Sequence, residues 1–270
     1  MTYRYFSVND AEYAYQVFGE GEVLLLFHGF TGSSLSWERF VEEFSSKYQV
    51  ITIDLPGHGK TRCQTPRTMK TFSDDLVELL KHLSVKKVHL LGYSMGGRTA
   101  LSFTFYYPEM VESLILESAS PGLKTEEERI ARMNQDQALA NMILSKGIRE
   151  FVSYWENIPL FHTQKRLPEE VQEKVRAERL MQTEKGLADS LLYMGTGKQP
   201  SWWGELTNVS QPVLLIVGEK DEKFVQINRK MAELFPNSEL KIVKDAGHAI
   251  HIEQWEKFVT IVMEFMSHLR

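Results

Sequence analysis

Short continuous apolar runs recur along the chain, and glycine, proline or charged residues bound each of them. Continuous rather than alternating apolarity is typical of parallel strands that are covered on both faces. Helical patterns lie between most of the runs, and this repeated strand–helix order predicts a doubly wound, mostly parallel α/β sheet. The predicted strands are residues 23–27, 50–53, 88–91, 114–116, 213–217 and 240–243.

The N-terminal segment has a different pattern, because residues 3–18 alternate aromatic and polar side chains. Tyr3, Tyr5, Tyr13 and Tyr15 form the aromatic series, and Asn9-Asp10 lies between its two halves as a turn. This arrangement predicts an antiparallel hairpin.

One long interval, residues 120–210, contains no strand-like run. It has helical patterns rich in charge at residues 125–145, 147–156, 168–182 and 184–194. An ordinary connection between strands is far shorter. We therefore expect residues 120–210 to form a helical cap over the C-terminal edge of the sheet, where doubly wound folds bind ligands. Residues 1–119 and 211–270 would then form the α/β core.

Composition and charge exclude several classes of protein. The chain has 270 residues, 43% of them hydrophobic and 25% charged, as in an average globular domain. A net charge of −5 argues against a nucleic-acid surface, so any anion site must be a local basic pocket. The single cysteine, Cys63, excludes a disulfide framework and a multi-cysteine metal site. With no signal-peptide pattern and no apolar run long enough to span a membrane, we expect a cytoplasmic protein that has no membrane partner.

The motif Gly92-Tyr93-Ser94-Met95-Gly96 carries the clearest chemical signal. It directly follows a predicted strand and precedes a helical pattern, as in the nucleophile elbow that exposes a reactive serine. The flanking positions need glycine because a Cβ there would collide with the adjoining backbone. Ser94 is therefore the candidate catalytic hydroxyl, at the N-terminal end of a helix.

Two loops supply partners for such a serine. Asp221 follows the predicted strand 213–217, and His248 follows the strand 240–243. The order Ser, Asp, His is that of the α/β hydrolases, in which the imidazole takes the serine proton and the carboxylate orients the imidazole. His251 competes with His248 for the role of base. Asp245 and Glu219 compete with Asp221 for the role of acid.

A possible oxyanion hole completes this set. His28-Gly29-Phe30 follows the predicted strand 23–27, at the position that contributes one backbone N–H to such a hole. The N–H of Phe30 would pair with that of Met95, whereas His58 in the next loop is interpreted as structural. Two N–H groups aimed at a developing oxyanion are each worth about 3–4 kcal/mol of barrier.

Several strings resemble one family within the α/β hydrolase superfamily. They are GYSMGGR, ESASPGLKTEEERIAR, WENIPLF, GTGKQPSWW and DAGHAIH. Together they are similar to the 2-succinyl-6-hydroxy-2,4-cyclohexadiene-1-carboxylate synthases of menaquinone biosynthesis. The resemblance implies a lyase that eliminates pyruvate from 2-succinyl-5-enolpyruvoyl-6-hydroxy-3-cyclohexene-1-carboxylate, with no metal and no organic cofactor. Ser94 would then be a base that takes a carbon-bound proton.

The resemblance also implies a set of substrate-binding residues, because this small-molecule substrate carries three carboxylates. Arg98, four residues after Ser94, would grip one of them. Arg132 and Arg179 match further carboxylate-binding positions, and Tyr93 and Trp155 would line the pocket. Arg129, one turn before Arg132, is not assigned to this set, and Glu156 is not carried over as a ligand.

Alternatives remain open at this point. Arg98 could instead form a partly buried ion pair with Glu117, and Arg132 and Arg179 could lie on solvated helix faces. The same triad would also serve a serine hydrolase that acts on a small acidic ester or a carbon–carbon bond. A non-catalytic scaffold is a third possibility, although such members usually lose a triad residue.

Overall fold

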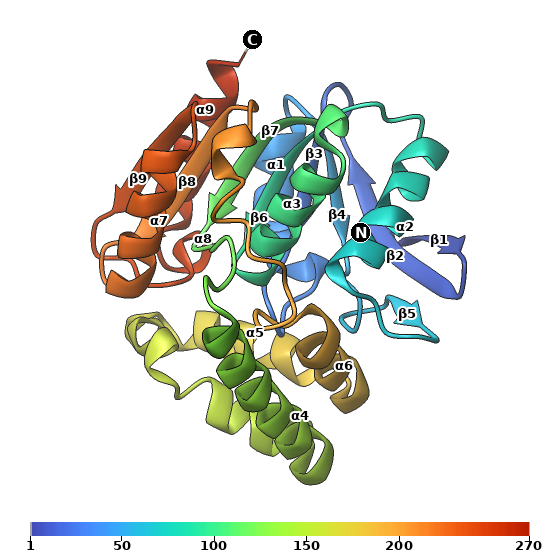
Figure 1. Ribbon diagram of the computed structural model, residues 1–270, viewed down its shortest axis with the longest axis vertical. Helices are drawn as coiled ribbons and strands as arrows, with labels where there is room; N and C mark the ends of the chain where they lie inside the picture. The colour runs from blue at the N-terminus through green and yellow to red at the C-terminus, as the bar shows by residue number, and fades with distance from the viewer. Residues whose placement is uncertain (1, 270) are drawn as a thin grey trace.

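The computed structural model of the protein describes residues 2–269, and its centre is a nine-stranded sheet (Figure 1). The strand order is β1-β2-β4-β3-β6-β7-β8-β9, and β5 (Arg62–Cys63) pairs with β2 beside this path. Six strands are parallel and coincide with the six predicted runs: β3 (Val23–Phe27), β4 (Gln49–Ile53), β6 (Val88–Tyr93), β7 (Val111–Glu117), β8 (Val213–Gly218) and β9 (Ser238–Val243). The predicted mostly parallel α/β sheet is confirmed.

The N-terminal hairpin is also confirmed. Strands β1 (Arg4–Val8) and β2 (Ala11–Phe18) pair antiparallel, with Val8 opposite Ala11. Asn9 in the turn has a φ of 53°, a left-handed conformation that asparagine tolerates better than most residues. Strand β5 was not predicted, since two residues are too few to form a pattern.

Helices cover both faces of the sheet, which explains why the strands read as continuous apolar runs. In β3, Leu25 and Phe27 face one buried cluster, whereas Leu24 and Leu26 face the other. Helices α2 (Met69–His82), α3 (Met95–Tyr106) and α7 (Glu222–Leu234) contribute to the first cluster. The second is closed by α1 (Glu38–Ser45), α8 (Ile250–Glu253) and α9 (Trp255–Ser267). Three short 3₁₀ helices were not predicted: η1 (Ser34–Trp37), η2 (Pro108–Met110) and η4 (Leu206–Asn208).

Four elements between β7 and β8 form a separate layer beyond one end of the sheet (Figure 1). These cap helices are α4 (Glu126–Trp155), η3 (Pro159–Arg166), α5 (Glu169–Leu180) and α6 (Glu184–Met194). They have a buried cluster of their own, in which Ile143 and Phe151 of α4 pack against Leu187 of α6. No strand lies between residues 120 and 210 of the described chain, as expected. The exact division into core and cap at these residues stays a prediction.

Helix α4 contains a break where two helical patterns were expected to meet. Gly147 has a φ of 82° and a ψ of 168°, which no helix accommodates, so the axis changes direction there. The backbone N–H of Ile148 is instead satisfied by the Glu184 carboxylate of α6, at 3.1 Å. The start of α4 is set by Thr125, whose side chain forms a capping box with Glu128.

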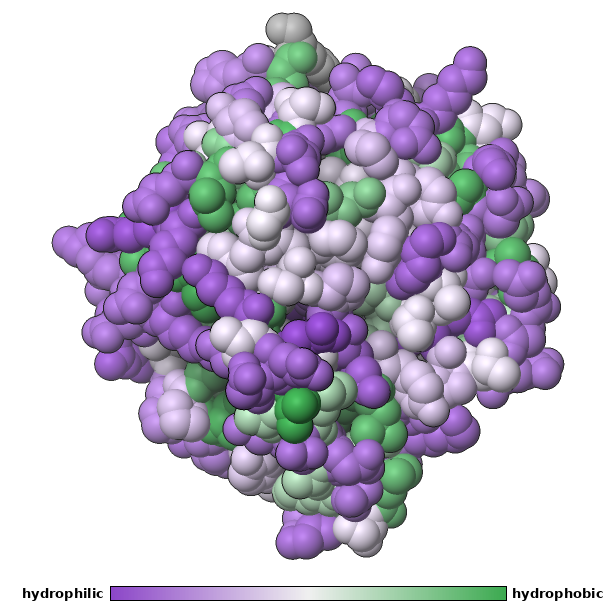
Figure 2. Space-filling view, in the orientation of Figure 1, coloured by the Kyte–Doolittle hydropathy of each residue, from purple (hydrophilic) through white to green (hydrophobic). Residues whose placement is uncertain are grey.

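Hydrophilic residues cover most of the face in Figure 2, and hydrophobic ones gather at its lower end, over the cap helices. In the part of the chain that the structure describes, no helix is both long and apolar enough to cross a membrane.

Candidate active site

Ser94 lies on a sharp turn between β6 and α3. Its φ of 51° and ψ of −105° are strained for a residue with a side chain. The close approach of the turn to its surroundings explains the neighbouring glycines. A Cβ at Gly92 would lie 2.3 Å from the Gly96 carbonyl oxygen, and one at Gly96 would lie 2.1 Å from that of Phe27. The local sequence therefore forces this turn and lifts the Ser94 hydroxyl out of it.

The three residues of the predicted triad lie in one hydrogen-bonded chain. His248 Nε2 is 3.0 Å from Ser94 Oγ, and His248 Nδ1 is 2.6 Å from Asp221 Oδ2. Asp221 is the N-cap of α7, so the backbone holds this carboxylate in place. The imidazole is only 1% exposed and packs against the ring of Phe224, 4.6 Å away between centroids. A buried imidazole held on both sides can accept the serine proton without reorienting.

The competitors of His248 and Asp221 are engaged elsewhere. Among the described residues, no hydrogen bond joins His251 to Ser94. Its backbone N–H and its Nδ1 both bond to the buried Glu117 carboxylate, at 2.9 and 2.8 Å. Asp245 forms an ion pair with Lys220, and its backbone N–H donates to Glu219. The geometry therefore leaves His248 and Asp221 as the pair beside Ser94.

Phe30 and Met95, the two residues expected to form an oxyanion hole, line the same cavity as Ser94. Met95 is the first residue of α3, so its N–H has no acceptor within the helix. Gly29 lets the loop approach the ring of Tyr93, since a Cβ there would lie 2.5 Å from that ring. Whether the two N–H groups act as an oxyanion hole stays a prediction.

Two buried histidines fix the loop that carries Phe30. His28 Nε2 accepts from the Leu55 N–H at 3.0 Å, and its Nδ1–H donates to the Gly29 carbonyl at 2.8 Å. His58 Nε2 accepts from the Thr31 N–H at 3.3 Å. Both rings must therefore be neutral to keep their acceptor nitrogens. Burial lowers the pKa of His28 to about 4 and that of His58 to about 3.

Acidification is therefore expected to destabilise the protein. Because these pKa values are lower in the folded than in the unfolded chain, the unfolded chain binds more protons below pH 6.5. The stabilising contribution is complete above pH 6.5 and is lost as the pH falls towards 4. His28 alone would cost about 2 kcal/mol at pH 5. Urea unfolding between pH 7.5 and 4.5 measures the free energy of unfolding. A His28→Gln variant should be less stable than the wild type at pH 7.5, and its stability should depend less on pH. An equal pH dependence in the two proteins would contradict the role given to His28.

A cavity of about 210 Å³ opens over Ser94 and His248, between the sheet and the cap helices. Besides Ser94 and His248, its walls include six of the predicted binding or oxyanion residues, namely Phe30, Tyr93, Met95, Arg98, Arg132 and Trp155. Phe161, Phe224 and Lys223 also line it and were not predicted. Lys223 lies two residues after Asp221, a spacing that the sequence offered as a signal.

Arg98 reaches this cavity from α3 and has no carboxylate partner among the described residues. Its Nη1 donates to the Met194 carbonyl at 3.0 Å and to Gln199 Oε1 at 2.9 Å, both uncharged. The alternative ion pair with Glu117 is wrong, since that carboxylate is occupied by His251. Burial lowers the pKa of Arg98 to about 9, and the nearby charge of Arg132 adds to this. A half-buried cation that has no ion-pair partner among the described residues is suited to bind an anionic ligand.

Arg132 and Arg129 lie one turn apart on α4 but have different surroundings. Arg132 lines the cavity, and its Nε donates to Asp136 at 2.7 Å. Arg129 does not line it, and its Nε donates to the Gly197 carbonyl at 3.2 Å. The placement thus separates the two arginines that the sequence could confuse.

Arg179 lies outside the cavity that holds Ser94. Its guanidinium lies over the ring of Phe161, 4.7 Å from the ring centre, and Nη2 donates to Gln164 at 3.3 Å. Phe161 lines both the cavity over Ser94 and the hollow beside Arg179, and a further small hollow is lined by Arg179 together with Phe30 and Tyr93. A role for Arg179 in binding substrate stays a prediction. Glu156, which was not carried over as a ligand, forms an ion pair with Arg176.

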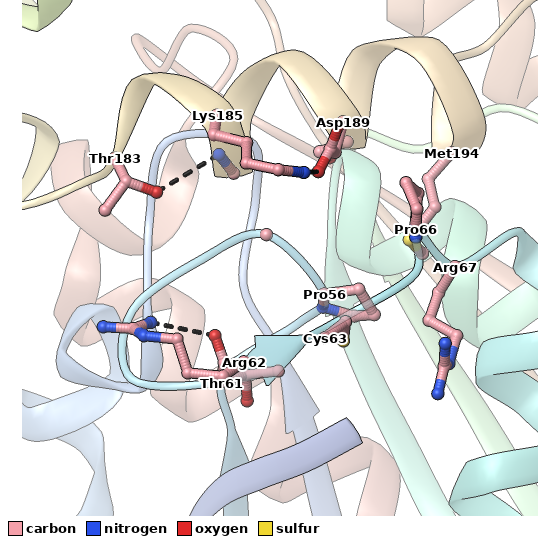
Figure 3. A pocket seen from close by; sticks show the side chains of 13 residues that line it. Pro56, Thr61, Arg62, Cys63, Pro66, Arg67, Thr183, Lys185, Asp189 and Met194 are labelled. Carbon is pink, nitrogen blue, oxygen red and sulfur yellow. Dashed lines mark hydrogen bonds and ion pairs between the residues drawn. The ribbon is translucent and has the colours of Figure 1, made fainter. Parts of the chain in front are cut away.

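A second hollow lies between α6 and residues 56–67, and the single cysteine, Cys63, is part of its lining (Figure 3). It measures about 120 Å³ and shares Ser190 with the cavity over Ser94. Burial raises the pKa of Cys63 to about 11, so its thiol is not a ready nucleophile. Arg67, beside it, is bound by Asp10 and Asp75. Among the described residues, no cluster of histidine, cysteine and acidic side chains could hold a metal ion.

Comparisons with known proteins agree with this geometry. Residues 22–254 match the alpha/beta hydrolase fold family. The chain is 47% identical to a Bacillus subtilis protein provisionally named 2-succinyl-6-hydroxy-2,4-cyclohexadiene-1-carboxylate synthase, over 94% of each chain. The structure of the present chain resembles MenH from S. aureus, with a TM-score of 0.92 and 38% identity over 94% of this chain and 98% of that one. It also resembles a malate-bound thermophilic esterase from Thermogutta terrifontis, with a TM-score of 0.86 and 28% identity over 100% and 99% of the two chains.

Proposed function

Because the chain belongs to the alpha/beta hydrolase fold family and, within it, to the 2-succinyl-6-hydroxy-2,4-cyclohexadiene-1-carboxylate synthases, we propose that Ser94 is the base of its lyase reaction. The enzyme eliminates pyruvate from 2-succinyl-5-enolpyruvoyl-6-hydroxy-3-cyclohexene-1-carboxylate, a step of menaquinone biosynthesis. The product is 2-succinyl-6-hydroxy-2,4-cyclohexadiene-1-carboxylate. The observation that carries the mechanism is the unbroken chain of hydrogen bonds from Ser94 through His248 to Asp221.

The reaction begins with removal of a carbon-bound proton. Ser94 Oγ takes this proton while its own proton passes to His248 Nε2, and the Asp221 carboxylate stabilises the resulting imidazolium. The electron pair left on carbon is delocalised onto the neighbouring carbonyl oxygen. The backbone N–H groups of Phe30 and Met95 would stabilise that charge. The anion then forms a ring double bond as the carbon–oxygen bond to the enolpyruvyl group breaks, and the released enolate takes a proton to become pyruvate.

The charge of the cavity supports a polycarboxylate substrate. Arg98 and Arg132 line it, and the molecule as a whole has a net charge of −5, so the basic character is local. A guanidinium can hold a carboxylate through two parallel hydrogen bonds and thereby place the acidic carbon over Ser94. Arg179 does not line this cavity, but it lines an adjoining hollow together with Phe30 and Tyr93, from which it would reach a substrate carboxylate. The acidic surface offers nothing to nucleic acid, and the single cysteine fits a reducing compartment, so we place the enzyme in the cytoplasm.

The direct test supplies the enolpyruvyl substrate to the purified enzyme. Pyruvate release, followed by coupling to lactate dehydrogenase and loss of NADH absorbance, is expected to be rapid and to require the enzyme. No release above the uncatalysed background would remove this function.

A serine hydrolase would use the same triad, and the similarity to a thermophilic esterase favours testing it. The hydrolase mechanism forms an ester on Ser94 Oγ, whereas the elimination leaves Ser94 unmodified. Mass spectrometry of the enzyme quenched during turnover of p-nitrophenyl acetate, and separately of the enolpyruvyl substrate, distinguishes them. We expect no adduct on Ser94 from the enolpyruvyl substrate.

A further inference from the structure

Asp136 is a buried carboxylate close to both arginines of the cavity but not part of its wall. It lies on α4, is 4% exposed, and accepts a hydrogen bond from Arg132 Nε at 2.7 Å through Oδ1. Its other oxygen, Oδ2, is buried and has no partner among the described residues. Gly195 allows this burial, because a Cβ there would lie 2.5 Å from Oδ2.

The hydrogen bond between Asp136 and Arg132 uses Nε, the guanidinium nitrogen bonded to the aliphatic part of the side chain. Neither Nη atom of Arg132 has a hydrogen-bond partner among the described residues, although the side chain lines the cavity. Since Nε is taken, rotation of the guanidinium is restricted and its outer two nitrogens remain available. Two parallel N–H groups are the arrangement that binds a carboxylate in bidentate fashion.

Asp136 also lies close to two positively charged side chains of the cavity. Arg98 and Arg132 repel one another, and Arg98 has only the neutral acceptors Met194 O and Gln199 Oε1. The Asp136 carboxylate attracts both guanidinium groups and opposes that repulsion. Two cations can thus face one small cavity before any anionic ligand arrives.

We propose that Asp136 is a positioning residue for carboxylate binding: it holds Arg132 by Nε so that the outer nitrogens face the ligand, and it offsets the repulsion between Arg132 and Arg98. The proposal deepens the proposed function, since it concerns the binding of the polycarboxylate substrate. Asp136 itself does not touch the ligand. Charge alone would predict the opposite effect, because removing a carboxylate beside an anion site should tighten anion binding.

The test measures binding of propane-1,2,3-tricarboxylate by isothermal titration calorimetry, which does not depend on turnover. We expect Asp136→Ala to raise the Kd at least tenfold. Asp136→Asn, which keeps an acceptor but loses the charge, should raise it by a smaller factor of at least three. In an Arg132→Ala background, Asp136→Ala should change the Kd less than twofold, because the two residues act as a unit.

Controls separate positioning from general damage to α4. Lys146 and Glu150 form another ion pair four residues apart on the same helix, at 3.0 Å and away from the cavity. Glu150→Ala should leave the Kd unchanged. Thermal melting checks that each variant is folded, and Asp136→Asn decides the question if Asp136→Ala does not fold.

Binding that is unchanged or tighter in Asp136→Asn would overturn the proposal, as would a further loss of more than threefold in the Arg132→Ala background. The enolpyruvyl substrate gives a parallel readout, in which KM should rise for Asp136→Asn while kcat stays within about threefold of wild type. If the wild-type enzyme binds the tricarboxylate in an Asp136-dependent way but releases no pyruvate, the proposed function fails and the positioning role stands.

Discussion

Replacing Ser94 with alanine is expected to lower kcat for pyruvate release by about 10²–10⁴-fold, the contribution of a well-placed general base. The hydroxyl is 3.0 Å from His248 Nε2, and no other hydroxyl is bonded to that imidazole among the described residues. His248→Ala should cause a comparable loss. Because the two act as one unit, the double variant should be little worse than either single one.

The fold should survive the loss of Ser94, since a single half-buried hydroxyl is removed from a turn whose shape is set by its glycines. The melting temperature of Ser94→Ala should therefore stay close to that of the wild type. Ser73, a buried serine on α2 whose hydroxyl bonds to the Met69 carbonyl, provides a control; Ser73→Ala should keep its turnover. A Ser94→Ala enzyme within tenfold of the wild-type rate would exclude Ser94 as the base.

Arg98→Ala is expected to lower kcat/KM by roughly 30-fold to several thousand-fold, which corresponds to a loss of about 2–5 kcal/mol of transition-state stabilisation. The reason is that a desolvated carboxylate of the substrate would lose its charged partner. The melting temperature should not fall. Arg98 is a half-buried cation whose hydrogen-bond acceptors are neutral groups, and its loss of solvent contact already disfavours the charged form. Steady-state kinetics together with thermal melting therefore separate a binding role from a structural one.

Two further arginine variants sharpen this result. Arg98→Lys keeps the charge but loses the planar fork, so it should recover only part of the activity. Arg129→Ala removes an arginine of α4, one turn before Arg132, that bonds to a backbone carbonyl outside the cavity, and kcat/KM should change less than about twofold. A lowered melting temperature in Arg98→Ala, with kcat/KM nearly unchanged, would return this residue to a structural role.

The sequence supported the strands and the candidate triad because both depend on local rules. Alternate residues of each parallel strand pack against opposite faces, so the runs are continuously apolar and easy to recognise. The elbow around Ser94 is equally local, since its glycines are required by contacts within a few residues and with the adjacent strand. Asp221 and His248 were found by their positions after two strands, and parallel strands bring such positions to the same edge of a sheet.

The surroundings of each arginine could not be predicted from such local rules. Arg98 lies 96 and 101 residues from the two groups that hold it, and Glu117 lies 134 residues from the histidine that occupies its carboxylate. Arg179 matches a family pattern yet lies over the ring of Phe161 and does not line the cavity over Ser94. Which side of a cap helix faces the cavity depends on how the cap packs on the core, and charged helices carry too little hydrophobic periodicity to predict it.

By itself, then, the chain's amino-acid order determined the parallel sheet, the strained turn at Ser94 and the loops that bear Asp221 and His248, because steric and hydrophobic constraints between near neighbours suffice for them. Only the tertiary structure decided that Arg98 has no ion-pair partner among the described residues, that Arg132 bonds to Asp136 while Arg129 lies outside the cavity, and that His251 bonds to Glu117. These contacts join segments that packing brings together. The strength of an electrostatic interaction depends on the distance between two charges in space and not on their separation along the chain.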